Sequence, residues 1–181
     1  NDLHFTMSET GWGKAAWGKL YGQWMSEAAI FVYDFEHRFP PLEVAKMIEK
    51  YHITTFCAPP TVYRFMIQED LTGIDLSSLR ASYVAGEPLN PEVIRWFDQV
   101  LNVPIYDHYG QTEVGMVVCN HHALEHSVKA GSAGFASPGY KIAVVGEQGE
   151  ILANDTPGIL AIDISQSPMM WFSGYDESRK S

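Results

Sequence analysis

Short apolar runs alternate with helical patterns between residues 24 and 113, and this alternation constrains the fold more than any other feature. Residues 29–33 form a continuous apolar run, as expected for a strand buried on both faces. Pro41 opens a helical pattern, and residues 54–57 form the next strand candidate, which a pair of prolines ends. Repeated strand–helix–strand units of this length predict a parallel sheet with helices on its faces.

The third unit of the series is the clearest. Residues 79–85 have the composition of a strand, and Asn90 followed by Pro91 is typical of a helix N-cap and first helical position. The predicted buried stripe of this helix consists of Val93, Phe97, Val100 and Leu101. A last strand begins at Pro104 and runs into the polar residues 107–113.

After residue 119, glycines punctuate short β-rich runs, and no helical pattern follows. This texture is typical of a small antiparallel subdomain. We therefore predict an α/β fold: a parallel sheet flanked by helices in residues 1–119, followed by a small, mainly antiparallel β subdomain in residues 120–181.

Three histidines, His121, His122 and His126, have the spacing of a metal cluster. No cysteine, carboxylate pattern or firm helix accompanies them. We therefore interpret this segment as a polar loop rather than a zinc site.

The composition excludes several classes of function. Twenty-two acidic residues against twelve basic ones leave a formal charge of −10, without the basic face that nucleic-acid binding needs. The longest apolar run, residues 28–33, is too short to span a membrane. Cys57 and Cys119 make a poor disulfide framework, which favours reduced thiols and a cytoplasmic location.

Polar segments follow two consecutive predicted strands, at residues 86–88 and 107–113. In an open parallel sheet, ligands bind beyond the carboxyl ends of the strands, so these segments are expected to meet at one edge. Each also has a simpler explanation. Residues 86–90 can form only a turn and a helix cap, and residues 107–113 can form a solvated loop.

The side chains of these segments suit a nucleotide. Gly86 has no Cβ, so a planar ligand can lie against its backbone, and Tyr109 offers an aromatic face for a base. Gln111 and Thr112 can hydrogen-bond a phosphate or an amide edge. Glu113 is a hard oxygen ligand suited to Mg²⁺.

Three stretches occur in a specific order along the chain. They are Ser-Glu-Thr-Gly-Trp at residues 8–12, Val-Ala-Gly-Glu-Pro-Leu at residues 84–89, and Tyr-Gly-Gln-Thr-Glu at residues 109–113. Together they resemble the adenylate-forming ligase superfamily, in particular the AMP-forming acyl-CoA synthetases of the acetyl- and medium-chain branch. Residues 56–61 are also similar to the medium-chain branch, and the likeness runs through nearly the whole chain.

The resemblance implies an acid–thiol ligase that uses ATP with Mg²⁺ as a substrate complex and coenzyme A as co-substrate, without a tightly bound cofactor. In this family a carboxylate attacks the α-phosphate of ATP, pyrophosphate leaves, and coenzyme A then displaces AMP. The nucleotide-binding residues that it implies are Gly86, Glu87 and Pro88 against adenine, with Asp107, His108, Tyr109, Gly110, Gln111 and Thr112 lining the adenine and the α-phosphate. Thr112 and Glu113 become the catalytic candidates, since Thr112 would bond the α-phosphate and Glu113 would hold Mg²⁺.

The acyl pocket is implied by Trp12, Val84 and Gly110. Acetate-specific relatives carry a tryptophan at the position of Gly110, so glycine there suggests room for a longer or aromatic acid. Trp12 taken alone is more often explained as a core residue.

Several parts of the family pattern do not occur in these residues. The Gly/Ser/Thr-rich phosphate loop is expected before Asn1, the ribose-binding aspartate after residues 172–175, and the catalytic lysine in a further domain. We therefore expect a central fragment of the large N-terminal domain, truncated in its β subdomain and inactive alone. Apolar surfaces exposed by truncation favour self-association. The alternatives are a non-enzymatic nucleotide-binding or interaction module and an adenylating ligase for an aryl acid or a carrier protein.

Overall fold

The computed structural model describes residues 2–34, 39–121 and 125–176. The chain forms two compact units, Asn1–Phe135 and Ala136–Ser181. The domain boundary expected after residue 119 stays a prediction; in the structure, the strand that ends at Cys119 and the residues up to Phe135 belong to the first unit.

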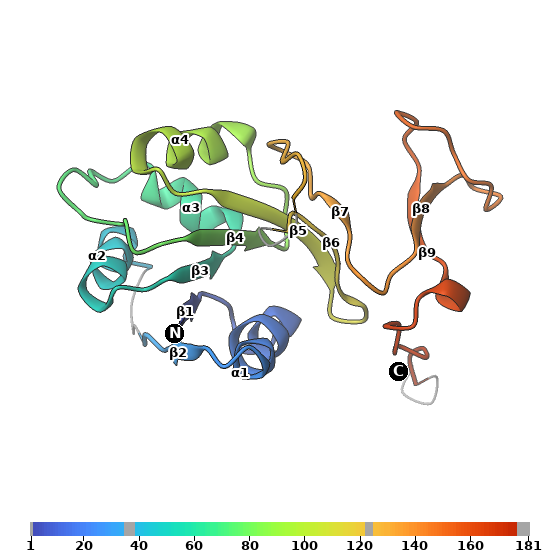
Figure 1. Ribbon diagram of the computed structural model, residues 1–181, viewed down its shortest axis with the longest axis horizontal. Helices are drawn as coiled ribbons and strands as arrows, with labels where there is room; N and C mark the ends of the chain where they lie inside the picture. The colour runs from blue at the N-terminus through green and yellow to red at the C-terminus, as the bar shows by residue number, and fades with distance from the viewer. Residues whose placement is uncertain (1, 35–38, 122–124, 177–181) are drawn as a thin grey trace. The chain divides into compact units, whose positions relative to one another are not determined.

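Seven strands make the main sheet, in the order β2-β1-β3-β4-β5-β6-β7. Their bounds are β1 Leu3–Thr6, β2 Ala29–Phe31, β3 Thr55–Ala58, β4 Ala81–Ala85, β5 Ile105–Gln111, β6 Gly115–Cys119 and β7 Phe135–Ala136. Strands β1 to β5 pair in parallel, whereas β5 and β6 form an antiparallel hairpin (Figure 1). The predicted parallel sheet is confirmed.

The helical segments described in the first unit are the π-helix η1 Ala15–Tyr21, α1 Gly22–Met25, α2 Pro41–Tyr51, α3 Pro60–Met66 and α4 Pro91–Leu101. The predicted cap of α4 is confirmed, because the Asn90 side chain accepts a hydrogen bond of 2.9 Å from the backbone N–H of Glu92. Within the described residues, no helix combines the length and apolar character needed to cross a bilayer.

Alternate residues of the strands face opposite sides of the sheet. On one side, Phe56 and Val84 join the apolar core together with Ile48 of α2, Tyr63 of α3 and Phe97 of α4. This core is continuous, and all five side chains are at most 1% exposed. It holds the three helices on their strands through burial of apolar surface.

The other side of the sheet faces η1 and α1 and is more polar. His4, Cys57 and Tyr83 line a cavity of about 160 Å³ there, together with Gly18 and Gln23 from the helical segments. Both faces of the sheet are therefore in contact with helical segments, as predicted from the alternating pattern.

Three local expectations were wrong. Strand β2 is an edge strand with partly exposed side chains, because β1, which the sequence did not reveal, lies between it and β3. Val100 is 59% exposed rather than part of the buried stripe of α4. Strand β5 continues to Gln111, so the first five residues of the expected polar loop are extended backbone paired with neighbouring strands.

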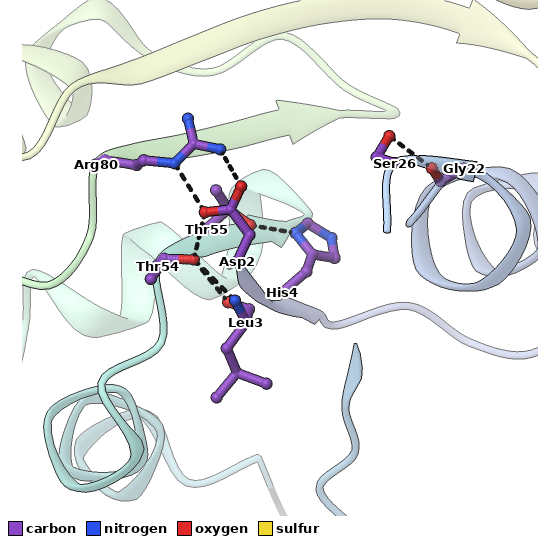
Figure 2. A network of polar contacts seen from close by, with 8 residues as sticks. All are labelled: Asp2, Leu3, His4, Gly22, Ser26, Thr54, Thr55 and Arg80. Atoms are coloured by element: carbon purple, nitrogen blue, oxygen red, sulfur yellow. Dashed lines mark hydrogen bonds and ion pairs between the residues drawn. The ribbon is translucent and has the colours of Figure 1, made fainter. Parts of the chain in front are cut away.

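A polar network fixes the first residues of β1 against β3 and β4 (Figure 2). The Asp2 carboxylate accepts hydrogen bonds from Arg80 at 2.6 and 3.0 Å and from the Thr54 hydroxyl at 3.0 Å. These partners, Arg80 above all, lower the pKa of Asp2 to about 2. The backbone N–H of Leu3 also donates to the Thr54 hydroxyl at 3.0 Å. Because the ion pair is exposed, its contribution is chiefly to strand alignment.

His4 is a buried polar residue of β1. Its Nδ1 lies 2.7 Å from the Thr55 hydroxyl and its Nε2 lies 2.6 Å from the Thr6 hydroxyl. The side chain is only 3% exposed, and burial lowers the pKa of His4 to about 4. The imidazole is therefore neutral at pH 7, with both nitrogens hydrogen-bonded.

The second unit contains the predicted antiparallel structure. Strands β8 Ile142–Val145 and β9 Ile159–Ile162 pair antiparallel, and the 3₁₀-helix η2 Ile164–Gln166 follows. The hydroxyl of Ser167 accepts a hydrogen bond of 2.9 Å from the backbone N–H of Lys141, which ties the segment after η2 to the start of β8.

The burial of His4 predicts acid sensitivity. Between pH 6.5 and about 4, the unfolded chain binds a proton at this imidazole that the folded chain does not bind, so the free energy of unfolding falls as the pH falls. The full effect is on the order of 3 kcal/mol. Urea unfolding of His4→Gln at pH 7 and pH 4.5 should show a much smaller difference between the two pH values than the wild type.

His52→Asn is the matched control, because His52 is exposed and lies in the left-handed region, where asparagine is tolerated. It should retain the pH dependence of the wild type. An unchanged pH dependence in His4→Gln would contradict the assignment to His4.

Candidate functional site

The carboxyl ends of β4 and β5 meet the segment that follows β1, and a cavity of about 250 Å³ lies between them. Its lining includes Trp12, Lys14, Gly86, Gly110, Gln111 and Thr112. Apart from Lys14, these residues come from the three sequence stretches singled out above. The expectation that the polar segments after β4 and β5 open onto one edge of the sheet agrees with this arrangement.

A close approach at Gly13 joins the first stretch to the third. A Cβ added at Gly13 would lie 2.7 Å from Oγ1 and 3.1 Å from Cα of Thr112. Any larger residue at this position would therefore displace Thr112 or the segment that carries Gly13. Glycine lets the backbone of residues 11–14 lie directly against the turn between β5 and β6.

Gly110 is also required by the backbone around it. The ladder between β5 and β6 shifts register between Tyr109 and Gly110, which marks a β-bulge. A Cβ at Gly110 would collide with the carbonyl oxygen of Gly115 and would lie 2.9 Å from Cα of Met116. The hairpin therefore accounts for this glycine, whatever the size of a ligand in the cavity.

Asp107 connects the segment after β4 to β5. Its side chain is 6% exposed, and burial raises its pKa, while hydrogen bonds from the backbone N–H groups of Leu89 and His108 lower it. Because Leu89 follows the Gly-Glu-Pro segment, Asp107 fixes that segment against the strand. Asn120 continues this network, since its Nδ2 donates to the backbone carbonyl oxygens of Asp107 at 2.9 Å and Ser132 at 2.7 Å.

The other predicted nucleotide residues flank the cavity residues in the sequence but do not line the cavity. Glu87 and Pro88 are exposed on the segment after β4, and His108 is partly buried against the ring of Tyr83. The Tyr109 side chain is 41% exposed, and its hydroxyl accepts a hydrogen bond of 3.3 Å from Nε2 of Gln111. The Tyr109 ring is therefore accessible to a planar ligand.

The predicted acyl-pocket residues do not all reach the cavity. Trp12 lines it and is 49% exposed, and Gly110 lines it as well. Val84 is fully buried in the apolar core on the other face of the sheet, while its neighbour Ala85 faces the cavity. The alternation of side chains along β4 explains the difference.

The metal candidates can be placed in part. Glu113 is half-buried in the turn between β5 and β6, next to the exposed Thr112. Across the described ranges, no three or more His, Cys, Asp or Glu side chains gather in a metal-binding group. His126 Nε2 accepts a hydrogen bond from the backbone N–H of His121, as befits a polar loop, and His122 lies outside the described residues.

Lys14 is a cavity residue that sequence reasoning missed. The side chain is 8% exposed, and its Nζ donates a hydrogen bond of 2.6 Å to the carbonyl oxygen of Ala85. Burial lowers the pKa of Lys14, while Cys57 and the carboxylate of Glu87 raise it. The only sequence signal was a lysine within the small and apolar residues that follow Trp12.

The link through Asp107 can be tested by hydrogen exchange. Asp107→Ala removes the acceptor of the Leu89 amide, so this amide should exchange at least about tenfold faster. The free energy of unfolding should fall by about 1–3 kcal/mol, because a buried donor loses its partner.

Asp98→Ala on the exposed face of α4 is the control and should leave the Leu89 amide unchanged. Equal exchange at Leu89 in Asp107→Ala and the wild type would show that this carboxylate does not hold the segment.

Known proteins are similar to this chain over most of its length. The sequence pattern of the family described as AMP-binding enzyme matches residues 12–175. The chain is 37% identical to the mitochondrial acyl-coenzyme A synthetase ACSM4 of Homo sapiens, over 97% of this chain and 30% of that protein. It is 34% identical to the mitochondrial acyl-coenzyme A synthetase ACSM3 of Rattus norvegicus, over 91% of this chain and 28% of that protein. The chain thus spans about 30% of the length of these relatives.

Solved structures share the fold. The crystal structure of Brucella canis acyl-CoA synthetase matches with a TM-score of 0.87 and 41% identity, covering 97% of this chain and 32% of that one. The anthranilate CoA ligase AuaEII matches with a TM-score of 0.83 at 22% identity, covering 100% of this chain and 35% of that one, a likeness of fold alone.

Proposed function

The chain belongs to the family of AMP-binding enzymes, and from this premise we propose that it is the central part of an AMP-forming acyl-CoA synthetase. The parent protein would join a carboxylic acid to coenzyme A. The acid's carboxylate oxygen bonds to the α-phosphorus of ATP. The bond between this phosphorus and the oxygen that bridges to the β-phosphate breaks, and pyrophosphate leaves. The thiol sulfur of coenzyme A then bonds to the acyl carbon, and AMP leaves.

One observation carries the proposal. The three stretches that resemble this family are far apart in the sequence, yet Trp12, Gly86 and Thr112 line one cavity. A site that must hold an acid next to the α-phosphate of a nucleotide needs these parts within a few ångströms of one another. The contact of Gly13 with Thr112 meets this need.

The nucleotide base would lie against the segment after β4. Gly86 has a φ of +108°, a conformation that suits glycine, and it presents backbone without a side chain at the cavity. Glu87 and Pro88 extend this platform, and the accessible ring of Tyr109 can stack on adenine. Asp107 and His108 hold the platform through the backbone of Leu89 and the strand pairing of β4 and β5.

The α-phosphate would lie at the turn between β5 and β6. The Thr112 hydroxyl can donate a hydrogen bond to a phosphate oxygen, and Gln111 can donate from its amide. As negative charge builds on the phosphate oxygens during attack, a fixed donor at this position stabilises the transition state more than the bound substrates.

The residues fit a Mg²⁺ ion that arrives with the nucleotide. Glu113 supplies one hard carboxylate next to Thr112, and the described part of the chain gathers no protein-only cage. Mg²⁺ commonly binds through one or two carboxylates, phosphate oxygens and water, which matches this donor set. When bound, the ion would neutralise charge on the phosphates. Coenzyme A would act as a second substrate, with no tightly bound cofactor.

The acid would occupy the side of the cavity formed by Trp12 and Gly110. Because the backbone of Gly115 and Met116 fills the Cβ position of Gly110, an acid longer than acetate rests on the resemblance and not on free space at this glycine. Val84 would act indirectly: it packs in the apolar core and so holds the strand whose next residue, Ala85, lines the cavity.

Location and assembly remain separate predictions. Cys57 and Cys119 are both buried thiols, consistent with a reducing compartment, and the relatives named above are mitochondrial. A cytoplasmic location and self-association through apolar surfaces stay predictions from the sequence.

The role of Thr112 can be tested in the full-length protein that carries this chain. Thr112→Ala should lower kcat/KM for acid-dependent ATP–pyrophosphate exchange by about a hundredfold to a thousandfold, since it removes a donor to the developing charge. Acids from propionate to octanoate provide the substrate panel. Thr112→Ser, which keeps the hydroxyl, should retain most of the activity.

Thr156→Ala, at an exposed position in the second unit, is the control and should behave like the wild type. The proposal fails if no acid in the panel supports exchange by the wild-type protein. It also loses its catalytic assignment if Thr112→Ala exchanges pyrophosphate normally.

A further inference from the structure

Lys14 is a buried cation that forms no ion pair with the residues that the structure describes. Its side chain is 8% exposed, yet its Nζ makes one hydrogen bond, to the carbonyl oxygen of Ala85. An ammonium group has three donors. No ion pair within residues 2–34, 39–121 and 125–176 involves Lys14. Two N–H groups of Lys14 are left to meet another acceptor.

A buried charge of this kind is costly unless acceptors surround it. Glu87 is near enough for its charge to raise the pKa of Lys14, but it does not come within ion-pair distance. Trp12 contributes a ring whose centroid lies 5.9 Å from Nζ, which partly compensates the charge. The remaining donors lie at the cavity that Lys14 itself lines.

Nζ lies between Trp12, on the proposed acid's side of that cavity, and Gly86, where the base is proposed to lie. It lies beside the ring of Trp12, and it is 3.9 Å from the position that a Cβ would take on Gly86. The nearby walls of the cavity are formed by the aromatic and thioether side chains of Trp12, Trp17 and Met116. Lys14 is thus a fixed cationic donor set among apolar side chains.

We propose that Lys14 selects acids whose chain carries an oxygen acceptor, such as an oxo group, a hydroxyl or a second carboxylate, over plain alkyl acids. The proposal rests on the acyl-CoA synthetase function argued above. An oxygen on the chain would accept hydrogen bonds from the two open N–H groups of Lys14. An alkyl chain would displace water from these N–H groups without supplying a hydrogen-bond acceptor in its place.

The expected selectivity follows from general energetics. A site whose buried donors are matched by the substrate rejects an analogue that lacks the acceptor, because the donors are then left unpaired. For hydrogen bonds to a charged group this corresponds to about tenfold to a hundredfold in kcat/KM.

The test uses matched acids and the full-length protein that carries this chain. ATP–pyrophosphate exchange is measured with hexanoate, 5-hydroxyhexanoate, 5-oxohexanoate and hexanedioate. The wild type should prefer at least one oxygen-bearing acid over hexanoate by about tenfold or more. Lys14→Met keeps the length of the side chain but removes the charge, so it should abolish this preference and accept hexanoate at least as well as the wild type does.

Lys46→Met is the matched control, because Lys46 is exposed on α2, and it should keep the wild-type preference. Lys14→Gln, which retains a donor, should keep part of the preference for the hydroxy and oxo acids, and it serves as the second variant if Lys14→Met folds poorly.

Three results would overturn the proposal. Wild-type protein that uses hexanoate as well as every oxygen-bearing acid shows no selection to explain. A Lys14→Met variant that loses activity equally with all four acids shows that the lysine serves the phosphate, or is neutralised by another part of the longer protein. A variant that keeps the wild-type preference assigns the selection to another residue. Failure of the wild type with every acid, by contrast, removes the proposed function itself.

Discussion

Direct backbone packing of Gly13 against Thr112 is the contact on which the cavity depends. The segment after β1 and the turn between β5 and β6 are far apart in the sequence, and a single Cβ at Gly13 would push them apart. The sheet brings the two segments to one edge, because parallel strands all end there. The glycine then lets them touch. The sheet topology thus determines where the site lies. The absence of a side chain at Gly13 determines how closely the two segments approach.

Two buried ionisable groups of this sheet, His4 and Asp107, find their partners within the protein. His4 is neutral and has a hydroxyl partner on each nitrogen, and Asp107 receives backbone N–H groups from Leu89 and His108. Both are satisfied by the protein itself, as buried groups of this type usually are. Lys14 differs, since a single carbonyl oxygen meets it within the described chain. Among these three ionisable groups, Lys14 is therefore the one whose hydrogen-bonding capacity is only partly used.

The sequence predicted the elements whose signals are local. The helix α4 has its cap residue, first-turn proline and buried Phe97 within a few positions, and β3 is a short apolar run that ends at prolines. Strand β1 was missed because two of its four residues, His4 and Thr6, are polar and are satisfied only through tertiary contacts. The same reason hid Lys14, since its partner Ala85 is distant in the sequence. The motif residues at the ends of β4 and β5 could be predicted from the sequence. The π-helix η1, which begins directly after Lys14, could not.

Gly110 has two possible explanations, the width of the acyl pocket and the backbone of the hairpin, and the sequence alone does not distinguish them. The resemblance links this glycine to the width of the acyl pocket, but its Cβ position is already occupied by the backbone of Gly115 and Met116. In this hairpin a side chain could enter the cavity at Gly110 only if the bulge between Tyr109 and Gly110 changed shape. Such a change would move Thr112 as well, because the turn follows directly. Pocket width and phosphate geometry are therefore coupled through one backbone, and a side chain at position 110 of this hairpin would change both.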